Sequence, residues 1–139
     1  MSDDCRVEEL GHTSEVGLRL SAATPETLYC CAARAMFDLL QTEVEPDAPA
    51  HRFEVHIAAQ DRESLMVDWL SELLYLHETE GIVLVDCRLT DLSQTSLLAV
   101  VEGSPPKAPP YLHIKAVTYH QIAVEQTGDG WAATMYFDI

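Results

Sequence analysis

The sequence predicts an α+β fold in which two helices pack against a mostly antiparallel sheet. Two segments carry apolar residues at helical spacing, and the segments around them alternate or are short and apolar, as strands are. The order is strand, helix, strand, helix and then four strands, which is typical of this class. Because 139 residues, 47% of them hydrophobic, can bury one core, we expect a single domain over residues 1–139.

The first strand is expected at residues 16–21, where apolar and polar side chains alternate after a loop at residues 11–15. Thr24 is a favourable N-cap, and Pro25 suits the first position of a helix. Apolar residues then recur every three or four positions. We therefore expect the first helix to begin at Pro25 and to end near Gln41.

The second strand and helix follow the same pattern. Alternation over residues 52–58 predicts the strand. Asp61 can cap a helix over residues 62–80, which has a broad apolar side. Gly81 suits the position just after its end, where glycine often adopts a left-handed conformation.

The C-terminal half reads as strands. They are expected at residues 82–89, 96–101, 111–126 and 131–139. Four prolines among residues 103–110 predict an extended loop, and a turn at residues 127–130 joins the last two strands as a hairpin. A strand-helix-strand pattern, followed by strand-helix-strand-strand, indicates two related modules with one inserted in the other.

The charge balance favours some partners over others. The chain has 23 acidic residues against 8 Lys and Arg, a net charge of −15, and its lysines are Lys107 and Lys115. Phosphate backbones repel such a chain, so we expect no strong direct binding to nucleic acid, whereas a basic protein or divalent cations suit it. No apolar run is long enough for a membrane helix and the acidic N-terminus lacks a signal-peptide core, so we expect a cytoplasmic protein without membrane contact.

The four cysteines, at positions 5, 30, 31 and 87, form neither a CxxC motif nor a zinc-binding spacing. Cys30 and Cys31 are neighbours within the first predicted helix. We interpret the cysteines as small apolar residues that stay reduced in the cytoplasm.

The last strand carries carboxylates to the end of the chain. If a sheet holds this end, the side chain of Asp138 and the terminal carboxylate of Ile139 form a fixed anionic pair. Two such charges about 4 Å apart repel by roughly 4 kcal/mol at an effective dielectric near 20. A hard cation would remove that repulsion. A frayed and solvated acidic end is the alternative.

Two further segments carry residues suited to a site. The run His12-Thr-Ser-Glu15 offers an imidazole, hydroxyls and a carboxylate, either to a ligand or to nearby backbone groups. Residues 114–120 contain Lys115 and His120. In a regular strand these two side chains face opposite sides, so they meet only if a bulge lies between them.

Motifs of known catalysts are missing: there is no nucleophile elbow, P-loop, dinucleotide fingerprint or HExxH. We assign no catalytic residues and expect a protein that is not an enzyme. Two alternatives stay open. One is a metal-dependent hydrolase of a small phosphorylated substrate that uses Glu15, Asp138 and His120. The other is a chaperone-like binding module with an exposed apolar patch.

Taken together, four segments resemble the archease family, and the similarity spans nearly the whole chain. The segments are residues 12–17, 69–76, 114–120 and 137–139. The run Lys-Ala-Val-Thr-Tyr-His, which begins at Lys115, is the most specific of them. The resemblance implies a small α+β protein built from strand-helix-strand-strand modules.

The resemblance also implies a function. Archeases activate RtcB-type RNA ligases, which join tRNA halves, by promoting guanylylation of the ligase histidine and multiple turnover. Carried over to this chain, it implies a divalent-metal site at Glu15, Asp138 and Ile139, with calcium expected and magnesium or manganese as alternatives. Lys115 matches a lysine that the family needs for activation, and we assign His12 and His120 to the same role.

Three positions depart from the family pattern. Gly11 stands where the family usually has Asp, and Gln121 stands where it usually has Gly. Glu15 replaces another usual Asp, so its carboxylate keeps the charge but reaches one methylene farther. The geometry of the metal site is therefore expected to differ from that of other family members.

Overall fold

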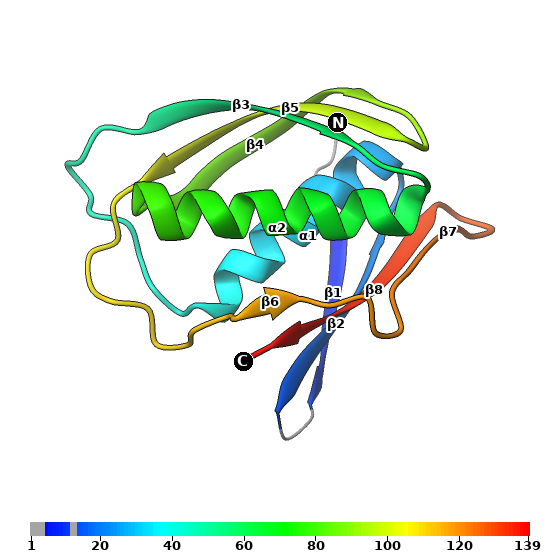
Figure 1. The fold of residues 1–139 in the computed structure, drawn as a ribbon, viewed down its shortest axis with the longest axis horizontal. Coiled ribbons are helices and arrows are strands. Elements are labelled where there is room, and N and C mark those ends of the chain that lie inside the picture. Colours follow the sequence, from blue (N-terminus) through cyan, green and yellow to red (C-terminus); the bar gives the residue numbers. More distant parts are fainter. Residues whose placement is uncertain (1–4, 12–13) are drawn as a thin grey trace.

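The computed structural model describes residues 5–11 and 14–139, which form two helices and eight strands (Figure 1). In chain order these are β1 (Cys5–Gly11), β2 (Glu15–Ala22), α1 (Pro25–Leu39), β3 (His51–Ala58), α2 (Arg62–Glu80), β4 (Val83–Leu92), β5 (Ser96–Ser104), β6 (Ala116–Val117), β7 (Ala123–Gln126) and β8 (Trp131–Asp138). The predicted α+β class is confirmed.

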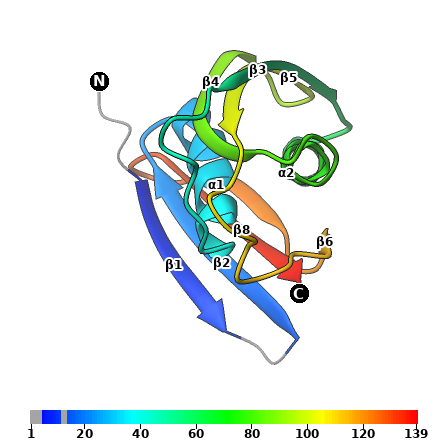
Figure 2. The ribbon, with the colours of Figure 1, turned by 90° about the vertical axis from the view of Figure 1, so that its left-hand side faces the viewer.

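The strands divide between two sheets in which every pairing is antiparallel. The larger sheet has the order β1-β2-β8-β6, with β7 also paired to β8, and the smaller has the order β3-β5-β4. Figure 2 shows α1 between the two sheets, where it contacts β2 and β4. The predicted insertion is visible in the topology, because β3, α2, β4 and β5 stand between α1 and β6 and build a sheet of their own.

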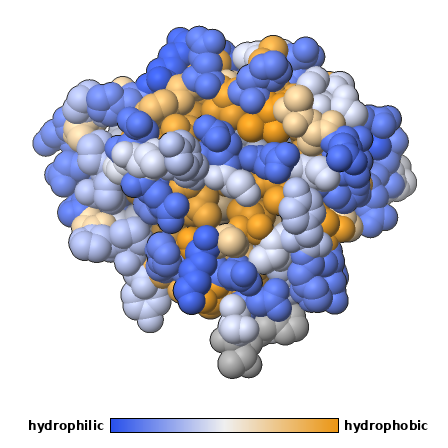
Figure 3. All heavy atoms as spheres, in the orientation of Figure 1, coloured by the Kyte–Doolittle hydropathy of each residue, from blue (hydrophilic) through white to orange (hydrophobic). Residues whose placement is uncertain are grey.

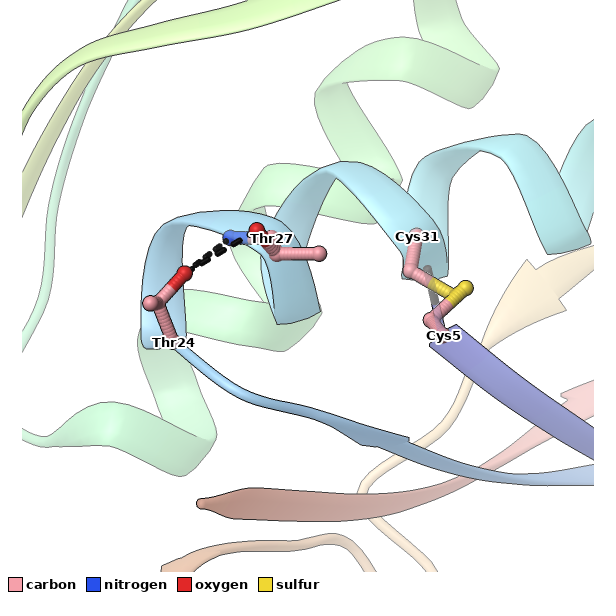
Figure 4. Close-up of a disulfide and its surroundings, with 4 residues drawn as sticks. All are labelled: Cys5, Thr24, Thr27 and Cys31. Atoms are coloured by element: carbon pink, nitrogen blue, oxygen red, sulfur yellow. Dashed lines mark hydrogen bonds between the residues drawn. A yellow bond between two sulfur atoms is a disulfide. The ribbon is translucent and has the colours of Figure 1, made fainter. Parts of the chain in front are cut away.

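Both helices begin at the cap residues that predicted them, and α2 also ends at its predicted signal. The Thr24 hydroxyl accepts from the Thr27 backbone N–H at 3.1 Å (Figure 4), and the Asp61 carboxylate accepts from the Ser64 N–H at 2.8 Å. Gly81 ends α2 with φ 65°, a left-handed conformation that glycine adopts easily. Helix α1 ends at Leu39, slightly before the predicted end.

The core lies between the sheets and includes the apolar sides of both helices. Trp69 is fully buried, and its indole N–H donates to the backbone oxygen of Tyr29 at 2.9 Å, which joins α2 to α1. Burial raises the pKa of the Tyr29 hydroxyl, which donates to the backbone oxygen of Arg62. Within the described part of the chain, neither helix has the length and apolar content needed to cross a membrane.

One strand was not predicted. Residues 5–11 form β1, which pairs with β2 along its whole length, from Cys5 opposite Ala22 to Gly11 opposite Val16. Most of its side chains are exposed, because β1 is an edge strand with its outer side in solvent. Because its side chains are mostly exposed, β1 shows little apolar alternation, and the sequence therefore predicts a loop at residue 11 instead of a strand end.

The single strand predicted for residues 111–126 is wrong. The chain forms only β6 and β7 there, and a turn between them brings the Ile122 N–H to the Tyr119 oxygen at 3.4 Å. Gln121 lies in this turn with φ 53°. Ile114 is buried whereas Ala116 is exposed, so burial does not alternate here as it would along one regular strand.

The interpretation of all four cysteines as reduced residues is also wrong. Cys5 and Cys31 form a disulfide that ties β1 to α1 (Figure 4). The pairing of β1 with β2 brings the two Cα atoms to 6.3 Å, a separation that a disulfide spans. Cys30 and Cys87 are buried and form no disulfide, as predicted for all four cysteines.

Candidate functional site

The candidate site begins with two carboxylates on neighbouring strands. Glu15 opens β2, and Asp138 closes β8 directly opposite it in the antiparallel register. Residues paired in this way have their Cβ atoms about 5 Å apart and project from the same face of the sheet. Met135 and Phe137 fill the core from the other face, so Asp138 points away from the core, as predicted. Like charges placed directly opposite each other destabilise the pair.

Hydrogen bonds on both sides hold the end of the chain. The Ile139 backbone N–H donates to the Ser14 oxygen at 3.4 Å, next to β2. On the opposite side, the Lys115 N–H donates to the Asp138 oxygen at 2.7 Å, next to β6. The side chain of Ile139 is partly buried against the core. The alternative of a frayed terminus is therefore wrong, and the main-chain end of Ile139 lies next to the two paired residues.

An aromatic pair extends this face of the sheet. Gly17 lies opposite Tyr136, one pair inward from Glu15 and Asp138. A Cβ atom at Gly17 would lie 2.5 Å from the Cε2 atom of Tyr136, so the ring covers the glycine. The ring of His120 packs edge-on against Tyr136 with centroids 5.6 Å apart. His120 thus lies on the same face as the carboxylates, although it comes from the turn and not from a strand.

Lys115 is the predicted site residue whose position differs most from the others. Its backbone bonds Asp138, but Ala116 is the residue of β6 that pairs with Asp138. The Lys115 side chain is exposed, and the residue lies just before β6, outside any strand. Among residues 5–11 and 14–139, Lys115 makes no ion pair with a carboxylate.

His12 lies outside the described residues. Within the described ranges, no three His, Cys, Asp or Glu side chains are grouped closely enough to hold a metal. Glu15, Asp138 and the main-chain end of Ile139 nevertheless meet at one corner of the larger sheet. Carboxylate oxygens are the donors that hard cations such as calcium prefer. The residues present thus fit a divalent cation, with two side chains and one main-chain group as its donors.

Comparison with known proteins decides the family. Residues 8–139 match the model of the Archease protein family. The chain belongs to the archease family. Archease from Methanosarcina acetivorans is 37% identical over 141 residues, which cover 96% of this chain and 96% of the relative. Archease from Methanopyrus kandleri is 33% identical over 138 residues, which cover 95% and 98% of the two chains.

Solved structures share the archease fold seen here. The solution structure of Methanobacterium thermoautotrophicum protein 1598 superposes with a TM-score of 0.71 at 25% identity, and the match covers 96% of this chain and 98% of that one. The crystal structure of a Thermotoga maritima archease, described as a possible chaperone, gives 0.68 at 18% identity, with 95% and 96% coverage. The second likeness concerns the fold alone.

Sequence reasoning missed two residues of this face, Gly17 and Tyr136. The signal was present for Gly17, because a glycine inside a strand often marks the close approach of another group. The signal for Tyr136 was its position two residues before Asp138, which places both side chains on the same face of a strand. The Tyr136 side chain is buried although it lies on the outer face, because Gly17 and His120 adjoin its ring.

Proposed function

We propose that this protein activates an RtcB-type RNA ligase by promoting guanylylation of the ligase histidine and multiple turnover, without catalysing the reaction itself. Membership in the archease family supports this proposal. The observation that carries it is the direct pairing of Glu15 with Asp138 at a strand end held on both sides. A fixed cluster of carboxylates can be presented to a partner without being reorganised when the partner binds.

A divalent cation belongs to the proposal, with calcium first and magnesium or manganese as alternatives. Glu15, Asp138 and the terminal carboxylate of Ile139 would hold it. Such a cation, when bound, neutralises negative charge on nucleotide phosphates beside the ligase histidine. The chain itself contributes the fixed spacing of the carboxylates, which the β2–β8 register determines.

Lys115, His120 and His12 are proposed to contact the ligase. The exposed Lys115 side chain makes no ion pair among the described residues, so its charge is available to a phosphate or to an acidic group of the partner. His120 is exposed and is oriented by the Tyr136 ring. The net charge of −15 disfavours direct contact with RNA, so the ligase and not its RNA is the partner. The cytoplasm, where tRNA halves are joined, is the proposed location.

Guanylylation of an RtcB-type ligase, measured under single-turnover and multiple-turnover conditions, tests the proposal. We expect Asp138→Asn and Lys115→Ala each to lose activation. Two exposed matched controls are expected to retain it: Asp47→Asn removes another carboxylate, and Lys107→Ala removes the other lysine of the chain. Full activation by both site variants would contradict the proposal.

Measuring calcium binding by the isolated protein tests the cation site independently of ligase activation. We expect Asp138→Asn to weaken calcium binding in titration calorimetry at least about tenfold, a loss that even outer-shell partners of a metal cause. Asp47→Asn again serves as the control. Equal calcium affinity in both variants and the unaltered protein would remove the cation from the proposal.

The same assays decide between the remaining alternatives. A hydrolase would turn over a phosphorylated substrate with no ligase present. A chaperone-like module would bind unfolded clients through apolar surface and without metal. Figure 3 shows apolar patches on the face that carries α2, divided by hydrophilic residues. The large exposed apolar side chains lie on separate elements, among them Val7 on β1, Tyr75 on α2 and Leu98 on β5, which favours the ligase activator.

A further inference from the structure

Two thiols outside the disulfide meet between α1 and the inserted sheet, away from the carboxylates of the candidate site. Cys30 of α1 and Cys87 of β4 are 7% and 5% exposed, and their side chains are hydrogen bonded to each other. Helix α1 packs closely on β4, so the contact joins the helix to the smaller sheet. Neither thiol belongs to the Cys5–Cys31 disulfide.

A cavity gives this pair access to a small reagent. It has a volume of about 320 Å³, and both Cys30 and Cys87 line it. Arg34, one helical turn after Cys30, and Arg88, next to Cys87, also line the cavity, together with Glu26 and Asp86. The lining of the cavity thus carries two charges of each sign beside the sulfur atoms.

The environment distinguishes the two thiols. The hydrogen bond with Cys30 and burial both raise the pKa of the Cys87 thiol. Cys87 is therefore a poor source of thiolate. Since a thiolate is the attacking species in disulfide exchange, Cys30 is the nucleophile and Cys87 the resolving thiol.

We propose that Cys30 and Cys87 form a redox-modification site, at which a low-molecular-weight disulfide such as oxidised glutathione converts the two thiols into a second disulfide. The Cys30 thiolate attacks one sulfur of the reagent, which forms a mixed disulfide and releases the first reagent thiolate. The Cys87 thiolate then attacks the Cys30 sulfur of the mixed disulfide, which forms the Cys30–Cys87 disulfide and releases the second reagent thiolate. The two cysteines lose two protons and two electrons, and the reagent becomes two thiols.

The new bond changes how the fold is linked. The Cys5–Cys31 disulfide ties α1 to β1 of the larger sheet. A Cys30–Cys87 disulfide would tie the preceding residue of the same helix to β4 of the smaller sheet. Together they connect one edge of each sheet through a single helix, so the oxidised protein is expected to unfold at a higher temperature than the dithiol form.

Peptide mapping of the full-length protein after incubation with oxidised glutathione tests the site. Thiols are alkylated under denaturing conditions before digestion. The dithiol form is expected to take up two alkyl groups, and the oxidised form none. The expected new product is one peptide pair linked through Cys30 and Cys87, with Cys5–Cys31 intact and a raised melting temperature. No variant is needed for this measurement.

Two variants then test the order of the steps. In Cys87→Ala, Cys30 is expected to retain one glutathione as a stable mixed disulfide, whereas in Cys30→Ala the reaction of Cys87 is expected to be markedly slower. Three results with the unaltered protein would overturn the proposal: two thiols that stay alkylatable, stable glutathione adducts without a cross-link, or cross-links from Cys30 or Cys87 to Cys5 or Cys31.

Discussion

At Gly17, one added methyl group would displace an aromatic ring of the candidate site. The Cβ atom of Gly17→Ala would lie 2.5 Å from the Tyr136 ring, which also contacts His120. We expect this substitution to lower the free energy of unfolding by about 1–3 kcal/mol, as overpacking does. Urea denaturation measures it.

The matched control is Gly128→Ala, because no atom lies within 4 Å of a Cβ atom at Gly128. We expect its free energy of unfolding to stay within about 0.5 kcal/mol of the original. Equal effects of the two substitutions would mean that the Tyr136 ring moves aside freely, and that Gly17 has no special role in positioning it.

Gln121 holds a backbone conformation that suits glycine. Its φ of 53° lies in the left-handed region. We expect Gln121→Gly to raise the free energy of unfolding by about 1 kcal/mol, because a non-glycine residue is strained there by roughly that amount. Gln121→Ala keeps the strain and is the control. A gain in both variants, measured by thermal denaturation, would assign the effect to the lost side chain instead.

Some of the site residues were predictable and others were not. Asp138 was placed correctly because strand alternation fixes its face once Met135 and Phe137 are apolar. The partnership of Asp138 with Glu15 was predicted from the family resemblance alone, because no local spacing in the sequence links positions 15 and 138. The contact of His120 with Tyr136 depends on a turn that the sequence did not reveal.

Helix α2 provides a test of pH dependence at the level of one element. The backbone N–H of Ser64 holds the pKa of the Asp61 carboxyl below its ordinary value of 3.8. The unfolded chain therefore binds this proton more readily than the folded protein does. The stabilisation is complete above the ordinary value and is lost as the pH falls through the lower, folded value.

We expect the free energy of unfolding to fall more steeply on acidification in the unaltered protein than in Asp61→Asn. Asparagine also caps helices well but does not titrate, so the variant isolates the carboxyl. Urea denaturation over the acidic range measures both proteins. Parallel curves would mean that Asp61 contributes no pH dependence and that other carboxyl groups account for the acid sensitivity.

The helices were predicted more accurately than the strands for a local reason. The caps at Thr24, Asp61 and Gly81 are sequence-adjacent to the helices they start or stop. A strand instead depends on a partner far along the chain. The break in residues 111–126 follows from pairing with β8, because Thr118 bonds the Tyr136 oxygen through both its N–H and its hydroxyl. No periodicity in the segment itself carries that information.

At the scale of the whole molecule, the Cys5–Cys31 disulfide links the edge strand β1 to the central helix. The two cysteines are 26 residues apart, a loop whose closure stabilises the fold by about 3.5 kcal/mol in the chain-entropy model. We expect Cys5→Ala to lose roughly this free energy of unfolding and to exchange β1 backbone hydrogens faster. Chemical denaturation and hydrogen exchange measure these effects.

A thiol reductant provides the control for this prediction. It is expected to reproduce the loss in the unaltered protein and to change Cys5→Ala no further. A reductant that destabilises both proteins equally would show that another bond is responsible. The sequence did not predict this disulfide because the β1–β2 pairing, which brings Cys5 to the helix, was itself missed.

The place of β8 has a consequence for synthesis on the ribosome. The strands of the inserted module are close in sequence, so they can pair while later residues are still being added. Strand β2, in contrast, emerges early and must wait for β8, which is made after every other described element. An unfinished polypeptide therefore has no opposed Glu15 and Asp138, and the candidate site exists only once β8 has been made.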